Sequence, residues 1–221
     1  ATTGNWSEVQ KIVASDRDVK DYFGYSVSIS GNYAIVGAAV EDEDASGQNT
    51  KRDAGSAYIF ERDATTGTWS EVQKIVASDR DSFDYFGFSV AIDGDYAIVG
   101  TQYEDKDASG LNSKQNAGSA YLFERNSITG KWSEVQKIVA SDRDRGDEFG
   151  YSVSISGNYA IVGARYAGSA YLFERNTTTG TWSEVQKIVA SDRDGYDRFG
   201  WSVSISGDYA IVGARYEDED A

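Results

Sequence analysis

The chain consists of four near-copies of one unit, and this repetition limits the folds available to it. The segment WSEVQKIVASDRD begins at Trp6, Trp69, Trp132 and Trp182 without a change in any copy. The starts lie 63, 63 and 50 residues apart, so the third unit is 13 residues shorter than the first two. A period of this length indicates one supersecondary unit stacked on itself, as in solenoids and propellers. We therefore expect residues 1–221 to form a single repeat domain.

Each unit contains segments with the pattern of β-strands. In FGYSVSIS, at residues 23–30, Tyr25, Val27 and Ile29 alternate with serine, which is the period of a half-buried strand. The YAIVGA segment is apolar on both faces, and AGSAY-[IL]-FER alternates small with large side chains. No stretch keeps the period of an amphipathic helix. The sequence therefore predicts an all-β protein.

Strands that are apolar on both faces must be covered on both sides. A four-stranded antiparallel sheet that repeats around an axis, with each sheet packed against the next, supplies this cover. The sequence thus predicts a β-propeller with four-stranded antiparallel blades. A β-solenoid is the alternative, but its coils usually repeat at shorter periods.

The pattern FGYSVSISGNYAIVGA, followed by AGSAYIF and then by Trp, resembles the FG-GAP repeat of integrin-α-like β-propellers. The closest likeness is to the bacterial-type variant, in which a short Ser-Gly-Asp hairpin replaces an acidic calcium loop. The resemblance implies one blade per unit and a non-enzymatic, extracellular or cell-surface protein used for adhesion or structural assembly. Four units are fewer than such propellers commonly have.

The last blade is predicted to be incomplete. If a blade contains the FG, YAIVG, AGSAY and Trp strands in that order, three blades are complete, and the fourth has only its first two strands at 199–213. Either the N-terminal Trp strand or another chain, such as a second copy, would complete it. A longer array of the same unit is the alternative. An open sheet edge favours self-association.

The composition excludes several functional classes. The net charge of -15 argues against binding to nucleic acid, and no apolar run is long enough to insert into a membrane. The chain has no His and no Cys, so it lacks the usual neutral-pH acid/base group and any thiolate. No unique set of catalytic residues stands out from the repeats. We therefore expect no enzymatic activity.

Two long acidic loops, at 41–53 and 104–116, and the start of a third at 217–220 resemble a calcium-binding frame. Their D-x-D-x-S-G spacing brings alternate oxygens toward one ion in EF-hands, and Gly permits the bend. The twelfth residue is not Glu and no helices flank the loops, so the sequence predicts weak binding, with a dissociation constant of roughly 10⁻⁴–10⁻³ M. The alternative is a solvated acidic loop. The predicted ligands are Asp42, Asp44, Ser46, Asp53, Asp105, Asp107, Ser109, Asn116, Asp218 and Asp220.

Each unit also carries the acidic segment SDRDxxDxFG, which includes Asp16, Asp18 and Asp21 in the first copy. Arg lies between the first two carboxylates as a counter-charge, and Asp is a favoured turn residue. A structural role is therefore favoured over chelation. We also expect the aromatic residue that follows each FG pair to lie between blades.

A propeller lectin is the alternative function. In that case aromatic side chains and loop acids would hold a glycan between blades, with or without calcium, in place of a protein ligand. The repeat-initial Trp residues suit a hydrophobic core better than a sugar platform. Asn5 and Asn176 begin N-x-[ST] sequons in the turns opposite the acidic loops and are predicted glycosylation sites.

Overall fold

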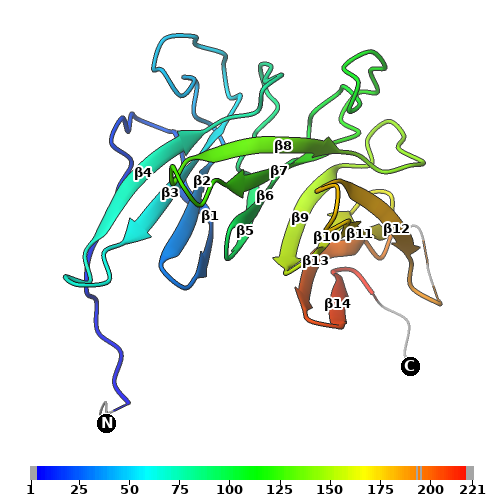
Figure 1. Ribbon diagram of the computed structural model, residues 1–221. Coiled ribbons are helices and arrows are strands. Elements are labelled where there is room, and N and C mark those ends of the chain that lie inside the picture. Colours follow the sequence, from blue (N-terminus) through cyan, green and yellow to red (C-terminus); the bar gives the residue numbers. More distant parts are fainter. Residues whose placement is uncertain (1–3, 193, 195, 218–221) are drawn as a thin grey trace.

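The computed structural model describes residues 4–192, 194 and 196–217, and these residues form strands, turns and loops without a helix (Figure 1). The predicted all-β class is confirmed. That part of the chain contains no helix long and apolar enough to cross a membrane.

The FG strands are β1 (Phe23–Ser30), β5 (Ser89–Asp93), β9 (Phe149–Ser156) and β13 (Phe199–Ser206). The YAIVG strands are β2 (Tyr33–Ala38), β6 (Tyr96–Thr101), β10 (Tyr159–Ala164) and β14 (Tyr209–Ala214). The AGSAY strands are β3 (Ser56–Arg62), β7 (Ser119–Arg125) and β11 (Ser169–Arg175), and the Trp strands are β4 (Trp69–Ile75), β8 (Trp132–Ile138) and β12 (Trp182–Ile188).

These strands form blades in the predicted order. β1–β4, β5–β8 and β9–β12 each form a four-stranded antiparallel sheet, and β13 pairs with β14 in a two-stranded sheet. Three blades are therefore complete and the fourth is half formed within the described residues. The register is the same in the three complete blades, where the first Tyr of the YAIVG strand lies opposite the Glu of the AGSAY strand. These pairs are Tyr33–Glu61, Tyr96–Glu124 and Tyr159–Glu174.

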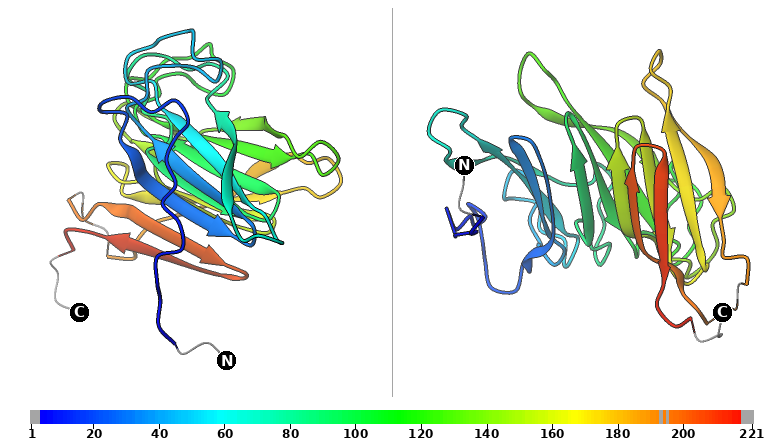
Figure 2. Two further views of the ribbon diagram at one scale, coloured as in Figure 1. Left: turned by 90° about the vertical axis from the view of Figure 1, so that its left-hand side faces the viewer. Right: turned by 90° about the horizontal axis from the view of Figure 1, so that it is seen from below.

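The sheets follow one another in chain order, with their faces in contact, and the first and last sheets lie at opposite ends of the row (Figure 2). The FG strands β1, β5, β9 and β13 contact one another along the inner edge. The Trp strands β4, β8 and β12 form the opposite edge of each complete sheet. This is the arrangement of successive propeller blades, which confirms the predicted fold class.

Glycine is required where the inner strands of neighbouring blades approach most closely. Gly87 has a φ of 88°, and a Cβ at this position would lie 2.3 Å from the carbonyl oxygen of Ser56. A Cβ at Gly37 would lie 2.0 Å from the carbonyl oxygen of Gly87. The hydroxyl of Ser26 donates a hydrogen bond of 2.8 Å to the same carbonyl. Larger side chains here would force the first two blades apart.

Aromatic side chains fill the core. Phe86 is fully buried and meets the rings of Tyr121 and Phe123 edge to face, at centroid distances of 5.6 and 6.0 Å. The aromatic residues that follow each FG pair contact one another from blade to blade, as predicted. Their centroid distances are 4.9 Å for Tyr25–Phe88, 5.1 Å for Phe88–Tyr151 and 4.9 Å for Tyr151–Trp201.

Two of the repeat-initial Trp residues are core residues, as predicted. Trp132 and Trp182 are 3% and 2% exposed. Their rings lie 5.9 and 6.3 Å from those of Tyr33 and Tyr96 in the preceding blade. Trp6 is 100% exposed, because no sheet precedes it among the described residues. For Trp6 the prediction of a core position is wrong in this structure.

The N-terminal segment lies beside the first blade, at the position where the outer strand of a preceding blade would lie. Residues 5–14 form no strand, although the same sequence forms β4, β8 and β12. The segment lies at the end of the row opposite to β13 and β14, so it does not complete the last blade (Figure 1). It is held there by the same hydrogen bonds that join the outer strands of successive blades. The side-chain amide of Gln10 forms two hydrogen bonds with the backbone of Trp69, at 2.8 and 2.9 Å, as Gln73 does with Trp132 and Gln136 with Trp182.

Candidate functional site

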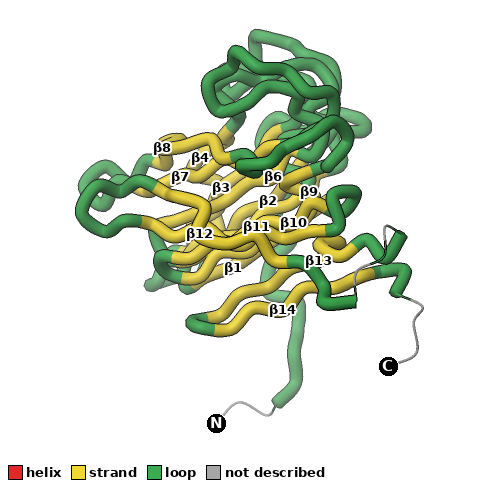
Figure 3. Tube along the Cα trace, turned by 90° about the vertical axis from the view of Figure 1, so that its right-hand side faces the viewer, coloured by secondary structure: helices red, strands yellow, loops and turns green. Residues whose placement is uncertain are grey.

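Most of the predicted site residues lie on loops at one end of the sheets. We call this end the loop face; it comprises segments 39–55, 76–88, 102–118, 139–148 and 165–168. The two long loops project from the same end, as the sequence predicts (Figures 1 and 3). Backbone hydrogen bonds join the long loop of the first blade to the second blade. The N–H of Phe83 donates to the carbonyl of Arg52 at 2.8 Å, and that of Phe86 to the carbonyl of Ala54 at 2.9 Å.

Asp42 and Asp105 close the bases of the two long loops. The carboxylate of Asp42 accepts a hydrogen bond of 2.7 Å from the backbone N–H of Asp53, and Asp105 accepts one of 2.7 Å from Asn116. Asp53 and Asn116 have φ values of 51° and 53°, a left-handed conformation in which Asp and Asn are enriched. The first and twelfth residues of each predicted calcium frame are therefore brought together.

The middle carboxylate of each frame is bound by donors of its own loop. Oδ1 of Asp44 accepts hydrogen bonds from the hydroxyl and the backbone N–H of Ser46, at 2.6 and 2.8 Å, and Oδ2 accepts one from the amide of Asn49. These hydrogen bonds hold the pKa of the Asp44 carboxyl well below its usual range. Asp107 is held in the same way by Ser109 and Asn112.

The carboxylates predicted to bind calcium, those of Asp42, Asp44, Asp105 and Asp107, therefore accept hydrogen bonds from their own loops. Within residues 4–192, 194 and 196–217, no group of three or more His, Cys, Asp or Glu side chains is arranged to hold a metal ion. An ion at Asp44 would have to displace the donors of Ser46 and Asn49. Asp218 and Asp220 lie outside the described residues. Calcium binding at these loops stays a prediction.

The arginine of the SDRD segment holds the long loop of the preceding blade. Arg80 is buried, and its guanidinium donates hydrogen bonds to the backbone carbonyls of Asp42 and Asn49, at 2.8 and 2.6 Å. Burial lowers the pKa of Arg80. Sequence reasoning favoured a structural role but took the arginine as a counter-charge for its neighbours in the chain. Arg143 makes the same contacts with Asp105 and Asn112, at 2.7 and 3.1 Å.

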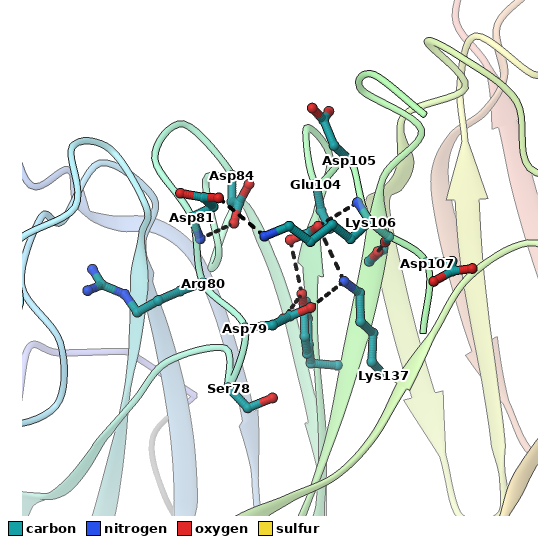
Figure 4. Close-up of polar contacts among 12 residues, drawn as sticks. Ser78, Asp79, Arg80, Asp81, Asp84, Glu104, Asp105, Lys106, Asp107 and Lys137 are labelled. Carbon is teal, nitrogen blue, oxygen red and sulfur yellow. Dashed lines mark hydrogen bonds and ion pairs between the residues drawn. The ribbon is translucent and has the colours of Figure 1, made fainter. Parts of the chain in front are cut away.

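A buried ion-pair network lies beneath the loop face of the second blade (Figure 4). The hydroxyl of Tyr121 donates to Asp79 at 2.8 Å, and Nζ of Lys137 lies 2.7 Å from Asp79 and 3.3 Å from Glu104. Burial opposes ionisation of Asp79, but the hydrogen bonds from Lys137 and Tyr121 outweigh it and lower the pKa of this carboxyl. Sequence reasoning missed this network; the constant spacing of these residues in two units was the available signal. The first blade repeats it with Asp16, Glu41, Tyr58 and Lys74.

Asp84 adjoins this network, and its surroundings favour the protonated form of its carboxyl group. Its side chain is buried and accepts a hydrogen bond of 2.5 Å from the backbone N–H of Asp81. Burial and the charge of Glu104 raise the pKa of Asp84 to about 8. The nearby Lys106 pairs with Asp81 at 3.2 Å (Figure 4).

In the third blade, the loop between β10 and β11 is short, at residues 165–168, and carries an arginine in place of the acidic residues of the two long loops. Arg165 lies 4.0 Å from the ring centroid of Tyr151 and 4.9 Å from that of Trp201. It also forms a buried ion pair with Glu148 at 2.5 Å. The acidic loop of the first two blades is thus replaced here by an arginine held between aromatic rings.

The two predicted glycosylation sites are exposed. Asn5 lies in the N-terminal segment, and Asn176 lies in the turn between β11 and β12. The side-chain oxygen of Asn176 accepts hydrogen bonds of 2.9 and 3.0 Å from the backbone of Thr178 and Thr179. Glycosylation of either residue stays a prediction.

Comparison with known proteins agrees with the repeat architecture. The sequence profile of the FG-GAP repeat matches residues 6–60, 69–123, 132–173 and 182–221. No curated protein matches the chain in sequence.

Several solved structures have a similar backbone but are much longer. A 6-phosphogluconolactonase candidate from Bacteroides fragilis is 16% identical, with a TM-score of 0.46 over 72% of this chain and 36% of its own. A protein from Lactobacillus plantarum is 17% identical, with a TM-score of 0.45 over 74% and 40%. Sqt1 from Saccharomyces cerevisiae is 8% identical, with a TM-score of 0.46 over 80% and 38%. The chain therefore spans less than half the length of these proteins.

Proposed function

Because the chain belongs to the FG-GAP repeat family, we propose that it is a non-enzymatic module of extracellular or cell-surface adhesion or structural assembly. FG-GAP repeats are typical of extracellular and surface proteins, and a stack of blades supports a binding or structural role. The part of this proposal that the geometry supports best is assembly. It would be made end to end, through the faces by which blades pack on one another inside the chain.

The observation that carries the proposal is the exposure of blade faces at both ends of the row. The front face consists of Val27 and Ile29 on β1, and Ile29 is 66% exposed. The rear face consists of Tyr209 and Ile211 on β14, which are 83% and 71% exposed. The isoleucines that correspond to Ile29 and Ile211 in the other blades are buried at the internal interfaces, and the tyrosines that correspond to Tyr209 are half-buried. These isoleucines include Ile92, Ile155 and Ile205 for the front face, and Ile35, Ile98 and Ile161 for the rear face.

The two faces are complementary because the chain already packs one on the other. Between the third and fourth blades, Ile161 of the rear type clusters with Ile205 and Val203 of the front type. The same relation would bring Ile211 of one copy against Ile29 of the next.

Burial of one such side chain contributes about 1.5–3 kcal/mol, so a contact between these faces would be favourable. Because the front and rear faces differ, the contact is heterologous and builds a ring or an open chain of copies.

The contacts of the side chains also favour this function over the alternatives. The carboxylates of Asp44, Asp79 and Asp107 accept hydrogen bonds from neighbouring residues, which suits structural roles. Trp132 and Trp182, which a lectin would use as sugar platforms, are buried against tyrosines of the preceding blade. The lectin alternative therefore has less support than assembly.

We propose calcium binding at the long loops as a second property of this module, supported by their spacing and by the adjacency of Asp42 and Asp53. Millimolar affinity is expected, because the ion must replace the donors on Asp44. Thermal unfolding in millimolar calcium and in excess chelator would test this. A third sample in millimolar magnesium is the control. The melting temperature should be higher in calcium than in magnesium or in chelator, and an equal melting temperature in calcium, magnesium and chelator would refute calcium binding.

Sedimentation velocity over a range of protein concentrations would test assembly. The average mass of the chain should rise with concentration, and Ile29→Asp and Ile211→Asp should each keep it monomeric. Ile128→Asp is the matched control, because Ile128 is exposed in a turn outside both faces. Assembly through these faces would be refuted by a wild-type chain that stays monomeric, or by a control that dissociates as the face variants do.

A further inference from the structure

At the first two contacts between blades, the long loop of one blade covers part of the loop face of the next. In the first contact, the backbone N–H groups of Phe83 and Tyr85 donate hydrogen bonds of 2.8 and 3.2 Å to carbonyls of the long loop. In the second contact, Gly146 and Glu148 donate bonds of 2.9 and 3.1 Å to the next long loop. A stretch of peptide backbone is therefore bound at this place in both contacts.

The contact between the third and fourth blades has no such loop. The third unit lacks the 13 residues of the long loop, so Tyr166 is followed directly by the AGSAY segment. Tyr196 and Arg198 occupy the positions of the N–H donors of the earlier contacts. Among the described residues, their backbone N–H groups form no hydrogen bond to the short loop. Tyr196 is 80% exposed, so this part of the fourth blade is open to a peptide from outside the chain.

Arginine and tyrosine side chains surround this uncovered backbone. The guanidinium carbon of Arg198 lies 3.7 Å from the ring centroid of Tyr166, and that of Arg165 lies 4.8 Å from the same centroid. Nη1 of Arg198 is buried and has no hydrogen-bond partner in the described part of the chain. An unpaired buried donor is unfavourable, and a carboxylate that binds this guanidinium would relieve the cost. We call Arg165, Tyr166, Tyr196 and Arg198 the arginine patch.

The patch is positively charged in a chain whose net charge is -15. Arg165 forms an ion pair with Glu148, whereas Arg198 has no ion-pair partner among the described residues. The first two blades have Ala39 and Gln102 at the position of Arg165, and both have tyrosine at that of Arg198. The positive charge is therefore particular to the contact that lacks a long loop, and it favours an acidic ligand.

We propose that the arginine patch binds an acidic, extended peptide segment of a partner protein. Carbonyls of this peptide accept hydrogen bonds from the backbone N–H groups of Tyr196 and Arg198, as carbonyls of the long loops do in the earlier contacts. A carboxylate of the peptide pairs with the guanidinium of Arg198, whose planar fork suits a carboxylate. This inference adds a partner to the binding role of the module and does not depend on end-to-end assembly.

Fluorescence anisotropy with a labelled decapeptide of alternating Glu and Ser tests the patch on the intact chain. Alternation places all its carboxylates on one side of an extended peptide. Saturable binding is expected, whereas a decapeptide of alternating Gln and Ser should not bind. Arg198→Ala should weaken binding about ten-fold or more, the range of hydrogen bonds to a charged group. Arg17→Ala is the matched control, because Arg17 is exposed and lies outside the patch, and it should bind as the wild type does.

Equal binding of the two peptides, equal losses in the two arginine variants, or no binding by the wild type would overturn the proposal. A sulfated oligosaccharide serves as the competing probe. If it binds more tightly than the acidic peptide and loses affinity in Arg198→Ala, the patch recognises a glycan and the peptide proposal is wrong.

A loop-insertion variant locates the bound peptide. A second copy of residues 104–116 is inserted after Tyr166, which gives the third blade the long loop of the second. The inserted loop should cover the patch and weaken peptide binding ten-fold or more in a variant that circular dichroism shows to be folded. Unchanged binding by this folded variant would overturn the site. Peptide binding by a chain that stays monomeric would uphold the patch and refute end-to-end assembly. Association without peptide binding would refute the patch alone.

Discussion

Asp84 links the protonation of one carboxyl group to the stability of the second blade. Its pKa is raised from 3.8 to about 8, first by burial and then by the charge of Glu104. The folded protein therefore holds a proton that the unfolded chain releases above its own pKa. Stability from this group is complete below pH 3.8 and is lost as pH rises through about 8.

The first prediction concerns the Asp84→Asn variant, whose amide imitates the protonated carboxyl. Between pH 5 and pH 9, the wild-type free energy of unfolding should fall relative to that of the variant by about 1.4 kcal/mol or more, the equivalent of one pKa unit or more. Urea unfolding across this range measures the difference. Asp208→Asn, at an exposed site outside the network, should stay parallel to the wild type. Parallel curves for wild type and Asp84→Asn would contradict the assignment.

The contacts of individual side chains could not be predicted from the sequence. The spacing of Asp42, Asp44 and Asp53 was visible, but the donors that occupy Asp44 come from its own loop conformation. The partner of Arg80 is a carbonyl more than thirty residues earlier, reached only because two blades stack. Neither contact follows from the spacing of charged residues in the sequence.

At the scale of elements, the contact between inner strands depends on glycine in a position-specific way. Gly24 and Gly87 occupy the same place in successive FG pairs and have φ values of 91° and 88°. A Cβ at Gly24 would meet nothing within 4 Å, whereas a Cβ at Gly87 would overlap the carbonyl of Ser56. An alanine at Gly24 would therefore cause backbone strain alone, whereas an alanine at Gly87 would cause the same strain together with steric overlap between blades.

The second prediction follows from this pair. Gly24→Ala should lower the free energy of unfolding by about 1–2 kcal/mol, the cost of a left-handed alanine. Gly87→Ala should cost roughly 3 kcal/mol or more, because overpacking against the first blade is added. Urea unfolding of both variants measures the difference. Equal losses would show that the blades do not approach closely at Gly87.

The strands themselves were predictable to a large extent. Alternation in FGYSVSIS, two-sided apolarity in YAIVGA and the repeat period together predicted the blade and the order of its strands. The N-terminal copy was the exception at this scale. Its sequence is that of β4, but it forms no strand, because each AGSAY strand among the described residues is already paired within its own blade.

At the scale of the whole molecule, the row of blades is open, and its two ends expose the same chemistry that its interior buries. Ile29 and Ile211 belong to opposite halves of one repeated interface. The sequence predicted an incomplete last blade, but it did not show that the N-terminal segment lies at the far end of the row. That outcome depends on how far the stacked sheets turn about their axis, which no local pattern encodes.

The most direct test of this account is to mix the two face variants and measure their mass by sedimentation velocity. Ile29→Asp keeps its rear face and Ile211→Asp keeps its front face, so each should be monomeric alone. An equimolar mixture has one intact pair of faces and should form a heterodimer that does not grow further. A mixture that stays monomeric while the wild type associates, or one that forms larger species, would contradict the central claim.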